Sequence, residues 1–207
     1  MRLVKYTHAC VRLERDGAVL VIDPGTFTER DALAGADAVL VTHEHRDHLD
    51  ADALRAACAD NPGLRVFTHP ELAAELDDLP VTAVGVGEEF AAAGFGVRVY
   101  GGRHAEIYGG LPGIANLGYL VEETVYHPGD SFAAPDVPVR ALLVPISAPW
   151  LKIAESIDLV RAVKPELAVP IHDALLTPPG AELTDNWVRN QGGAEYRRLA
   201  PGEGIEL

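Results

Sequence analysis

The segment Thr42-His-Glu-His-Arg-Asp-His-Leu-Asp50 constrains this chain more than any other. Three imidazoles and the carboxylate of Asp47 fall within the six positions from 43 to 48. Histidine and aspartate supply the nitrogen and oxygen ligands that zinc and similar divalent ions prefer. Because histidine is an infrequent residue, a solvated surface loop seldom concentrates it in this way. The segment therefore predicts a metal site.

The spacing of these residues excludes two familiar single-ion motifs. An H-E-x-x-H helix would need histidine at position 47, where Asp47 stands, and the inverted H-x-x-E-H form is absent. His43 and His45, two residues apart, can converge on one ion. Asp47 and His48, at a turn into a helix, can point to a second. We therefore expect two ions that share one cleft.

Short β-rich runs alternate with helical segments along the whole chain. The apolar run 38–42 predicts a central strand before the loop, and 52–59 predicts a helix after it, with Asp50 as its N-cap. Further strands are expected over 2–6, 10–14, 18–22, 65–68, 81–84, 96–100, 116–121, 124–127, 141–145 and 167–170, and helices over 70–76, 153–163 and 183–189. No linker divides the chain, so we expect one α/β domain over residues 1–207, with two packed sheets and helices outside.

Three further residues can complete the site, because each lies where a predicted strand meets a loop. They are His104 in Gly-Gly-Arg-His104, Asp130 in Pro-Gly-Asp130 and His172 in Pro-Ile-His172. Strand ends of this kind commonly carry functional side chains.

The whole pattern resembles the metallo-β-lactamase fold superfamily. T-H-x-H-x-D-H after a strand, followed by a distant H, G-D and P-x-H, spans the chain from Asp23 to His172. The opening segment Thr7–Glu14 resembles the small bacterial branch that includes L-ascorbate-6-phosphate lactonase and many metal-dependent hydrolases. The resemblance implies a four-layer αββα sandwich with the site at one edge, between the sheets.

The resemblance also implies the role of each ligand. One metal ion would be bound by His43, His45 and His104, the second by Asp47, His48 and His172, and Asp130 would bridge the two. Asp23 would hold a ligand imidazole through its free N–H. An N/O-only ligand set suits zinc first, with manganese or iron as alternatives.

A dinuclear metal-dependent hydrolase is the function that follows. A metal-bridging hydroxide, oriented by Asp47, would attack a small ester-like substrate. The resemblance favours lactones and phosphoesters, ahead of thioesters and phosphodiesters. Two alternatives are an iron-dependent redox enzyme of the same fold and a non-catalytic metal-binding protein. The chain shows no flavin-binding segment, and the complete ligand set argues against a non-catalytic protein.

Charge and composition restrict the partners. The chain has 17 Lys+Arg against 31 Asp+Glu, a net charge of −14. So acidic a chain has no general attraction for nucleic acid or for anionic membranes, and we expect a small-molecule substrate. No signal-peptide pattern is visible at the N-terminus, which favours a cytoplasmic location. Assembly into a homo-oligomer stays open.

Three residues are candidates for contact with the substrate. His8 lies in the opening motif, Arg103 precedes a predicted ligand and Trp150 follows Pro149. Each also has a structural alternative. For His8 this is a hydrogen bond across a turn, for Arg103 a surface ion pair and for Trp150 packing in the core.

Overall fold

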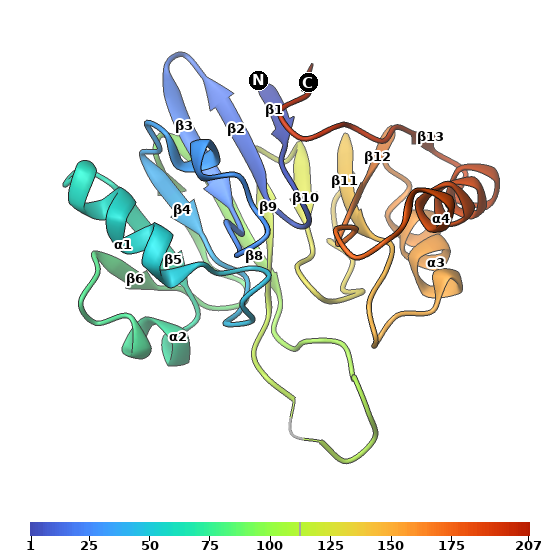
Figure 1. Ribbon diagram of the computed structural model, residues 1–207, viewed down its shortest axis with the longest axis horizontal. Coiled ribbons are helices and arrows are strands. Elements are labelled where there is room, and N and C mark those ends of the chain that lie inside the picture. The colour runs from blue at the N-terminus through green and yellow to red at the C-terminus, as the bar shows by residue number, and fades with distance from the viewer. Residues whose placement is uncertain (112) are drawn as a thin grey trace.

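The computed structural model describes residues 1–111 and 113–207, whose strands form two seven-stranded sheets (Figure 1). In spatial order, the first sheet consists of β14 (Gly204–Glu206), β1 (Arg2–Lys5), β2 (Val11–Arg15), β3 (Ala18–Ile22), β4 (Ala38–Leu40), β5 (Arg65–Thr68) and β6 (Val81–Ala83). The second consists of β13 (Glu195–Tyr196), β12 (Leu167–Ile171), β11 (Ala141–Pro145), β10 (Val125–His127), β9 (Leu117–Val121), β8 (Phe95–Gly101) and β7 (Glu89–Ala92).

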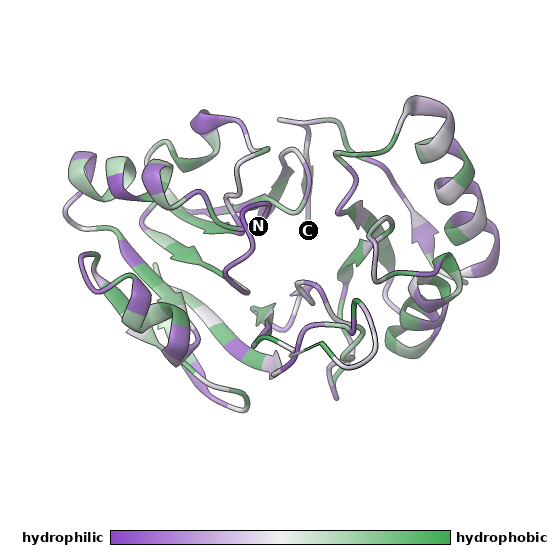
Figure 2. Cartoon of the chain, turned by 60° about the horizontal axis from the view of Figure 1, so that its bottom comes forward, coloured by the Kyte–Doolittle hydropathy of each residue, from purple (hydrophilic) through white to green (hydrophobic). Residues whose placement is uncertain are grey.

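Helices cover the outer face of each sheet. The first sheet carries the short helix η1 (Arg30–Leu33), α1 (Ala51–Asp60) and α2 (Pro70–Glu75), and the second carries α3 (Ile153–Val163) and α4 (Pro178–Gln191). Figure 2 shows these helices at the two flanks, with hydrophobic and hydrophilic residues alternating around their turns. The expected four-layer αββα sandwich is confirmed.

Strands at the centre of each sheet are buried on both faces. In β4, Ala38 and Leu40 pack into the core between the sheets, whereas Val39 packs against the helix side. Leu143 of β11 belongs to the same inter-sheet core and Leu142 to the helix side. This two-sided burial explains why these strands are continuous apolar runs rather than alternating ones.

The strand directions bring many loops to one edge of each sheet. β1, β2 and β3 form the expected antiparallel meander, and β3 to β6 are mutually parallel. In the second sheet, β10, β11 and β12 are parallel, and β8 runs the same way because β9 is antiparallel to both β8 and β10. The predicted ligands follow the carboxyl ends of β4, β8, β10 and β12.

Some elements differ from the sequence prediction. The last helix begins at Pro178 rather than at residue 183, because the Thr177 hydroxyl caps it by accepting from Gly180 N (3.3 Å). The strands β7, β13 and β14 and the helix η1 were not expected. None of the helices in residues 1–111 and 113–207 is long and apolar enough to cross a bilayer.

Candidate metal centre

The histidine-rich loop makes a tight turn between β4 and α1. The amides of His48 and Leu49 both donate to the carbonyl of His45, at 2.9 Å each. The loop ends at Asp50, whose side chain accepts from Ala53 N at 3.0 Å and so caps α1 as expected. This turn fixes the direction in which each ligand of the loop points.

The loop is packed directly on the segment that follows β3. Thr26 N donates to the carbonyl of Arg46 at 2.8 Å. A Cβ on Gly25 would lie 1.9 Å from the carbonyl oxygen of Asp47, so no larger residue fits there. The close approach depends on glycine at position 25.

Two groups of side chains bring their ligand atoms within 4.8 Å of one another. The first group is His43, His45, His104 and Asp130, and the second is His8, Asp47, His48 and His172. All seven residues predicted as ligands lie in these groups, with the six histidine and aspartate ligands other than Asp130 divided as the resemblance implied. His8 joins the second group, although it was expected only as a substrate contact or in a hydrogen bond across a turn.

The carboxylate of Asp130 lies between the two groups. Its Oδ1 is 3.0 Å from His48 Nε2. Its Oδ2 is 3.2 Å from Nε2 of both His104 and His172, and 3.7 Å from His43 Nε2. One buried carboxylate thus reaches ligands of both groups, which is the position that a bridging ligand needs.

Partners outside the site fix the orientation of the ligand imidazoles. In three of them Nδ1 lies 2.6 Å from an oxygen that can only accept a hydrogen bond. These pairs are His48 with Asp23 Oδ2, His104 with the Ala105 carbonyl, and His172 with the Ser147 carbonyl. Because Nδ1 donates outward, Nε2 is the nitrogen that faces the site, and in the neutral imidazole that binds a metal it presents its lone pair there.

Asp23 holds the loop as well as the imidazole of His48. Its fully buried carboxylate accepts from Thr42 N at 2.8 Å and from the Thr42 hydroxyl at 2.7 Å. The same hydroxyl lies 2.9 Å from His43 Nδ1 and accepts from it. Asp23 therefore fixes the orientation of two ligand imidazoles, that of His48 directly and that of His43 through Thr42.

The residues present fit divalent cations. Within the described residues, four buried ligand atoms lack a hydrogen-bond partner: Nε2 of His48, His104 and His172, and Oδ1 of Asp130. Buried polar atoms are normally hydrogen-bonded, and lone pairs that face carboxylate oxygens repel them. Cations between these atoms would satisfy all of them, as expected for zinc-type ligands.

The charges in the site stabilise one another. Burial disfavours the charged form of Asp130, but the facing imidazoles, His48 first, hold the pKa of its carboxyl well below its usual range. Burial alone would lower the pKa of His48, yet Asp130 and Asp23 raise it well above its usual value. Against the same effect of burial, Asp130 and Asp47 raise the pKa of His172 to about 9. The carboxylates thus create a field that favours positive charge, which protons on these imidazoles supply when no metal ion is bound and metal ions supply when they replace those protons.

The three candidates for substrate contact lie in different places. Trp150 is buried and its indole Nε1 donates to Asp130 Oδ2 at 3.2 Å. His8 is buried too, which lowers the pKa of its imidazole, and its Nε2 lies 3.0 Å from Asp47 Oδ2. Arg103 is exposed and lines a cavity of about 370 Å³. Their contact with substrate stays a prediction.

That cavity opens beside the first ligand group. Its polar wall contains His45 and His104 together with Arg103, and its apolar wall contains Ile107, Leu111 and Ile114. A larger hollow of about 610 Å³ runs along β7, β8 and β9, but no predicted ligand lines it. Of these two, only the smaller cavity is lined by predicted ligands.

Sequence reasoning missed Asn116, which holds Asp130 in place. Its Oδ1 accepts from Asp130 N and its Nδ2 donates to the Pro128 carbonyl, each at 2.9 Å. A Cβ on Gly129 would lie 2.3 Å from that Oδ1, so the Pro-Gly-Asp turn needs its glycine. The only signal in the sequence is a polar residue at the start of an apolar strand.

Comparisons with known proteins found related sequences and a solved structure of the same fold. The model of a family described as "Beta-lactamase superfamily domain" matches residues 2–172. Protein Rv0786c of Mycobacterium tuberculosis is 40% identical over 184 residues, which cover 86% of each chain. A UPF0173 metal-dependent hydrolase of Geobacillus thermodenitrificans is 30% identical over 100% of both chains. The solved structure of Igni18, a metallo hydrolase from Ignicoccus hospitalis, is 22% identical with a TM-score of 0.77, and covers 100% of this chain and 98% of its own.

Proposed function

Because this chain belongs to the beta-lactamase superfamily and, within it, to the UPF0173 family, we propose that it is a metal-dependent hydrolase with two divalent ions. The observation that carries the proposal is the place of Asp130 between two groups of inward-facing imidazoles. A relative that matches this chain over its full length is named a metal-dependent hydrolase, which supports the same class of reaction. The bond cleaved is an ester-type bond, with lactones and phosphoesters first.

The two ligand carboxylates differ in their exposure to solvent. The side chain of Asp130 is 2% exposed, whereas that of Asp47 is 28% exposed. A carboxylate inside a closed cluster holds cations, and a carboxylate that water reaches can also orient an attacking water. Asp47 takes this second role in the proposal. Bound divalent ions lower the pKa of water and polarise the oxygen of the scissile bond.

A small substrate fits the cavity beside the first ligand group. A volume of about 370 Å³ lies at the lower end of ordinary ligand pockets, and both apolar and cationic side chains line it. We assign the apolar wall to a hydrocarbon part of the substrate and Arg103 to an anionic group, because a guanidinium pairs with carboxylates and phosphates.

The metal content per chain tests the proposal first. The protein is purified, loaded with zinc or manganese in excess, freed of unbound ion and analysed by elemental mass spectrometry. We expect close to two ions per chain, and then hydrolysis within a panel of lactones, phosphoesters and thioesters. One ion or none, with excess metal supplied, would contradict the dinuclear site. An iron-loaded, coloured protein without hydrolase activity would favour the redox alternative.

A ligand variant links the metal to the activity. His48→Ala should lose bound metal and hydrolysis together, because His48 Nε2 faces Asp130. The matched control is His69→Asn, which also removes an imidazole. His69 lies outside both ligand groups, and its side chain caps α2, a role that asparagine can fill. Full activity in His48→Ala would refute the ligand assignment.

A further inference from the structure

We propose that His8 is a positioning residue, which holds Asp47 by a hydrogen bond and does not bind a metal ion itself. His8 and Asp47 both belong to the second ligand group, so His8 could have been read as a fourth ligand. The inference rests on the proposed function in one respect, namely that Asp47 is a metal ligand.

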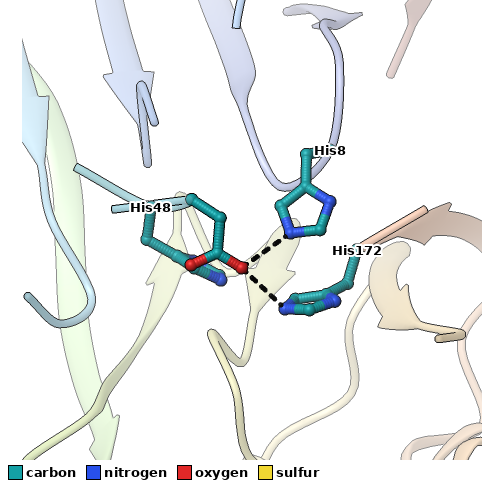
Figure 3. Close-up of side chains that lie close together, drawn as sticks. His8, His48 and His172 are labelled. Atoms are coloured by element: carbon teal, nitrogen blue, oxygen red, sulfur yellow. Dashed lines mark hydrogen bonds and ion pairs between the residues drawn. The ribbon is translucent and has the colours of Figure 1, made fainter. Parts of the chain in front are cut away.

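Both ring nitrogens of His8 have partners. The backbone N–H of Ala174 donates to Nδ1 at 3.2 Å, so Nδ1 carries a lone pair. The proton of the imidazole is then on Nε2, which lies 3.0 Å from Asp47 Oδ2 and donates to it. In Figure 3, dashed lines run from a ring nitrogen of His8 and from one of His172 to the same carboxylate oxygen, which is Asp47 Oδ2.

The ligand imidazoles have the opposite arrangement. Nδ1 of His48, His104 and His172 donates outward to an oxygen, and Nε2 presents its lone pair to the site. If His8 accepted from Ala174 with one nitrogen and bound a cation with the other, its ring would carry no proton at all. A neutral imidazole has one N–H, so His8 is a donor here.

The backbone of His8 is clamped in the conformation that this contact needs. Its φ of +66° is uncommon for a residue other than glycine. The carbonyl of His8 accepts from His172 N at 3.1 Å and from Lys5 Nζ at 2.7 Å. Lys5 is also 3.7 Å from Asp173. The turn between β1 and β2 is thereby fixed to the loop after β12, which carries His172.

Asp47 needs such a partner more than Asp130 does. Its side chain is 28% exposed, so the carboxylate has room to rotate on the solvent side. A hydrogen bond to Oδ2 from a fixed imidazole selects one orientation. Partners of this kind typically change metal affinity by about 10- to 100-fold when they are removed.

Two conservative variants separate this role from a purely structural one. His8→Gln places an amide N–H near the position of Nε2 and so keeps the donor to Asp47, while it loses the acceptor for Ala174. His8→Asn places its amide near Nδ1 and so keeps the acceptor, while it loses the donor. Zinc affinities of both ions are measured by competition with a chelator of known affinity, and folding is followed by thermal unfolding.

We expect His8→Asn to weaken binding of one zinc ion by about tenfold or more and to leave the other unchanged. The affinity of His8→Gln for both zinc ions should stay close to that of the parent protein. If His8→Asn binds both ions as tightly as the parent, or if His8→Gln loses at least as much affinity, the proposal is overturned. If the parent binds no zinc at all, the proposed function fails instead.

A measurement on the parent protein needs no variant. Nitrogen-15 NMR of the zinc-loaded protein reports which nitrogen of each histidine carries the proton. We expect the Nε2–H tautomer for His8, and the Nδ1–H tautomer for His48, His104 and His172. A proton on Nδ1 of His8, with zinc at its Nε2, would overturn the proposal.

Discussion

The indole Nε1 of Trp150 donates a hydrogen bond to Oδ2 of Asp130 at 3.2 Å. The indole ring stands edge-on to the imidazoles of His104 and His172, with ring centroids 5.6 and 5.7 Å away. Trp150 thus contacts the carboxylate that lies between the two ligand groups and packs against one imidazole of each. It therefore contacts both halves of the centre.

Replacement of Trp150 should therefore weaken the binding of both ions rather than of one. Trp150→Phe keeps an aromatic ring and removes the N–H, so Asp130 loses one of its fixed partners. We expect zinc affinity to fall by about tenfold for each ion, measured by chelator competition. Phe132→Leu is the control, because Phe132 packs on Trp150 with ring centroids 5.4 Å apart and its side chain has no donor for Asp130. An effect of the same size in both variants would mean that packing alone is responsible.

A second prediction concerns Asp23, whose carboxylate accepts three hydrogen bonds. Whichever way the amide of Asp23→Asn turns, its NH₂ group faces a donor of Thr42 or His48. We expect the free energy of unfolding to fall by about 1–3 kcal/mol and zinc affinity by about tenfold or more. Chemical denaturation and metal analysis measure the two effects.

The control for Asp23→Asn is Asp37→Asn. Asp37 Oδ2 accepts from the backbone N–H of Val19 at 2.9 Å, and Asp37 belongs to neither ligand group. It should lose some stability and no zinc affinity. If Asp23→Asn keeps the affinity of the parent, the outward hydrogen bond of His48 does not matter for metal binding.

The order of strands and ligands was predictable because both are local patterns. The apolar run before His43 signalled a strand buried on two faces, and the carboxyl ends of the strands located His104, Asp130 and His172. Helix α4 was predicted too short although Thr177 and Pro178 carry the usual start signal. The edge strands β13 and β14 have two and three residues, too few for any periodicity.

The outer partners of the site could not be predicted in the same way. The acceptors of His104 and His172 are backbone carbonyls, which every residue has, so the sequence contains no sign of them. Trp150 and His8 were expected near the site as candidates for substrate contact. Which atoms they contact depends on how loops from the two sheets meet, and only the tertiary structure contains that information.

A further prediction concerns the stability of the fold at acid pH and an ion pair outside the metal centre. The hydrogen bond from Arg15 lowers the pKa of Glu122, whose Oε2 lies 2.6 Å from Arg15 Nη1. A pKa lower in the folded than in the unfolded chain stabilises the fold above the unfolded value of about 4.3, and this contribution is lost as the pH falls through the folded pKa. Glu122→Gln should therefore lower the free energy of unfolding by about 1 kcal/mol near neutral pH and by much less near pH 3, as measured by urea unfolding.

The control is Glu182→Gln at an exposed position, which should show no such pH-dependent difference. A loss of stability in Glu122→Gln that stays constant with pH would contradict the prediction.

The last prediction concerns the charge that the cavity recognises. Within the described residues Arg103 forms no ion pair, and it shares the cavity with His45 and His104. Arg103→Gln should raise KM by about tenfold for the carboxylated form of whichever ester is cleaved best, since hydrogen bonds to charged groups contribute about 1.5–3 kcal/mol. KM for the uncharged form of that ester should not change, and kcat should change little for either. Arg30→Gln removes the same charge from an exposed position outside the cavity and should alter neither KM. An equal rise of KM for both forms would show that Arg103 shapes the cavity without recognising an anion.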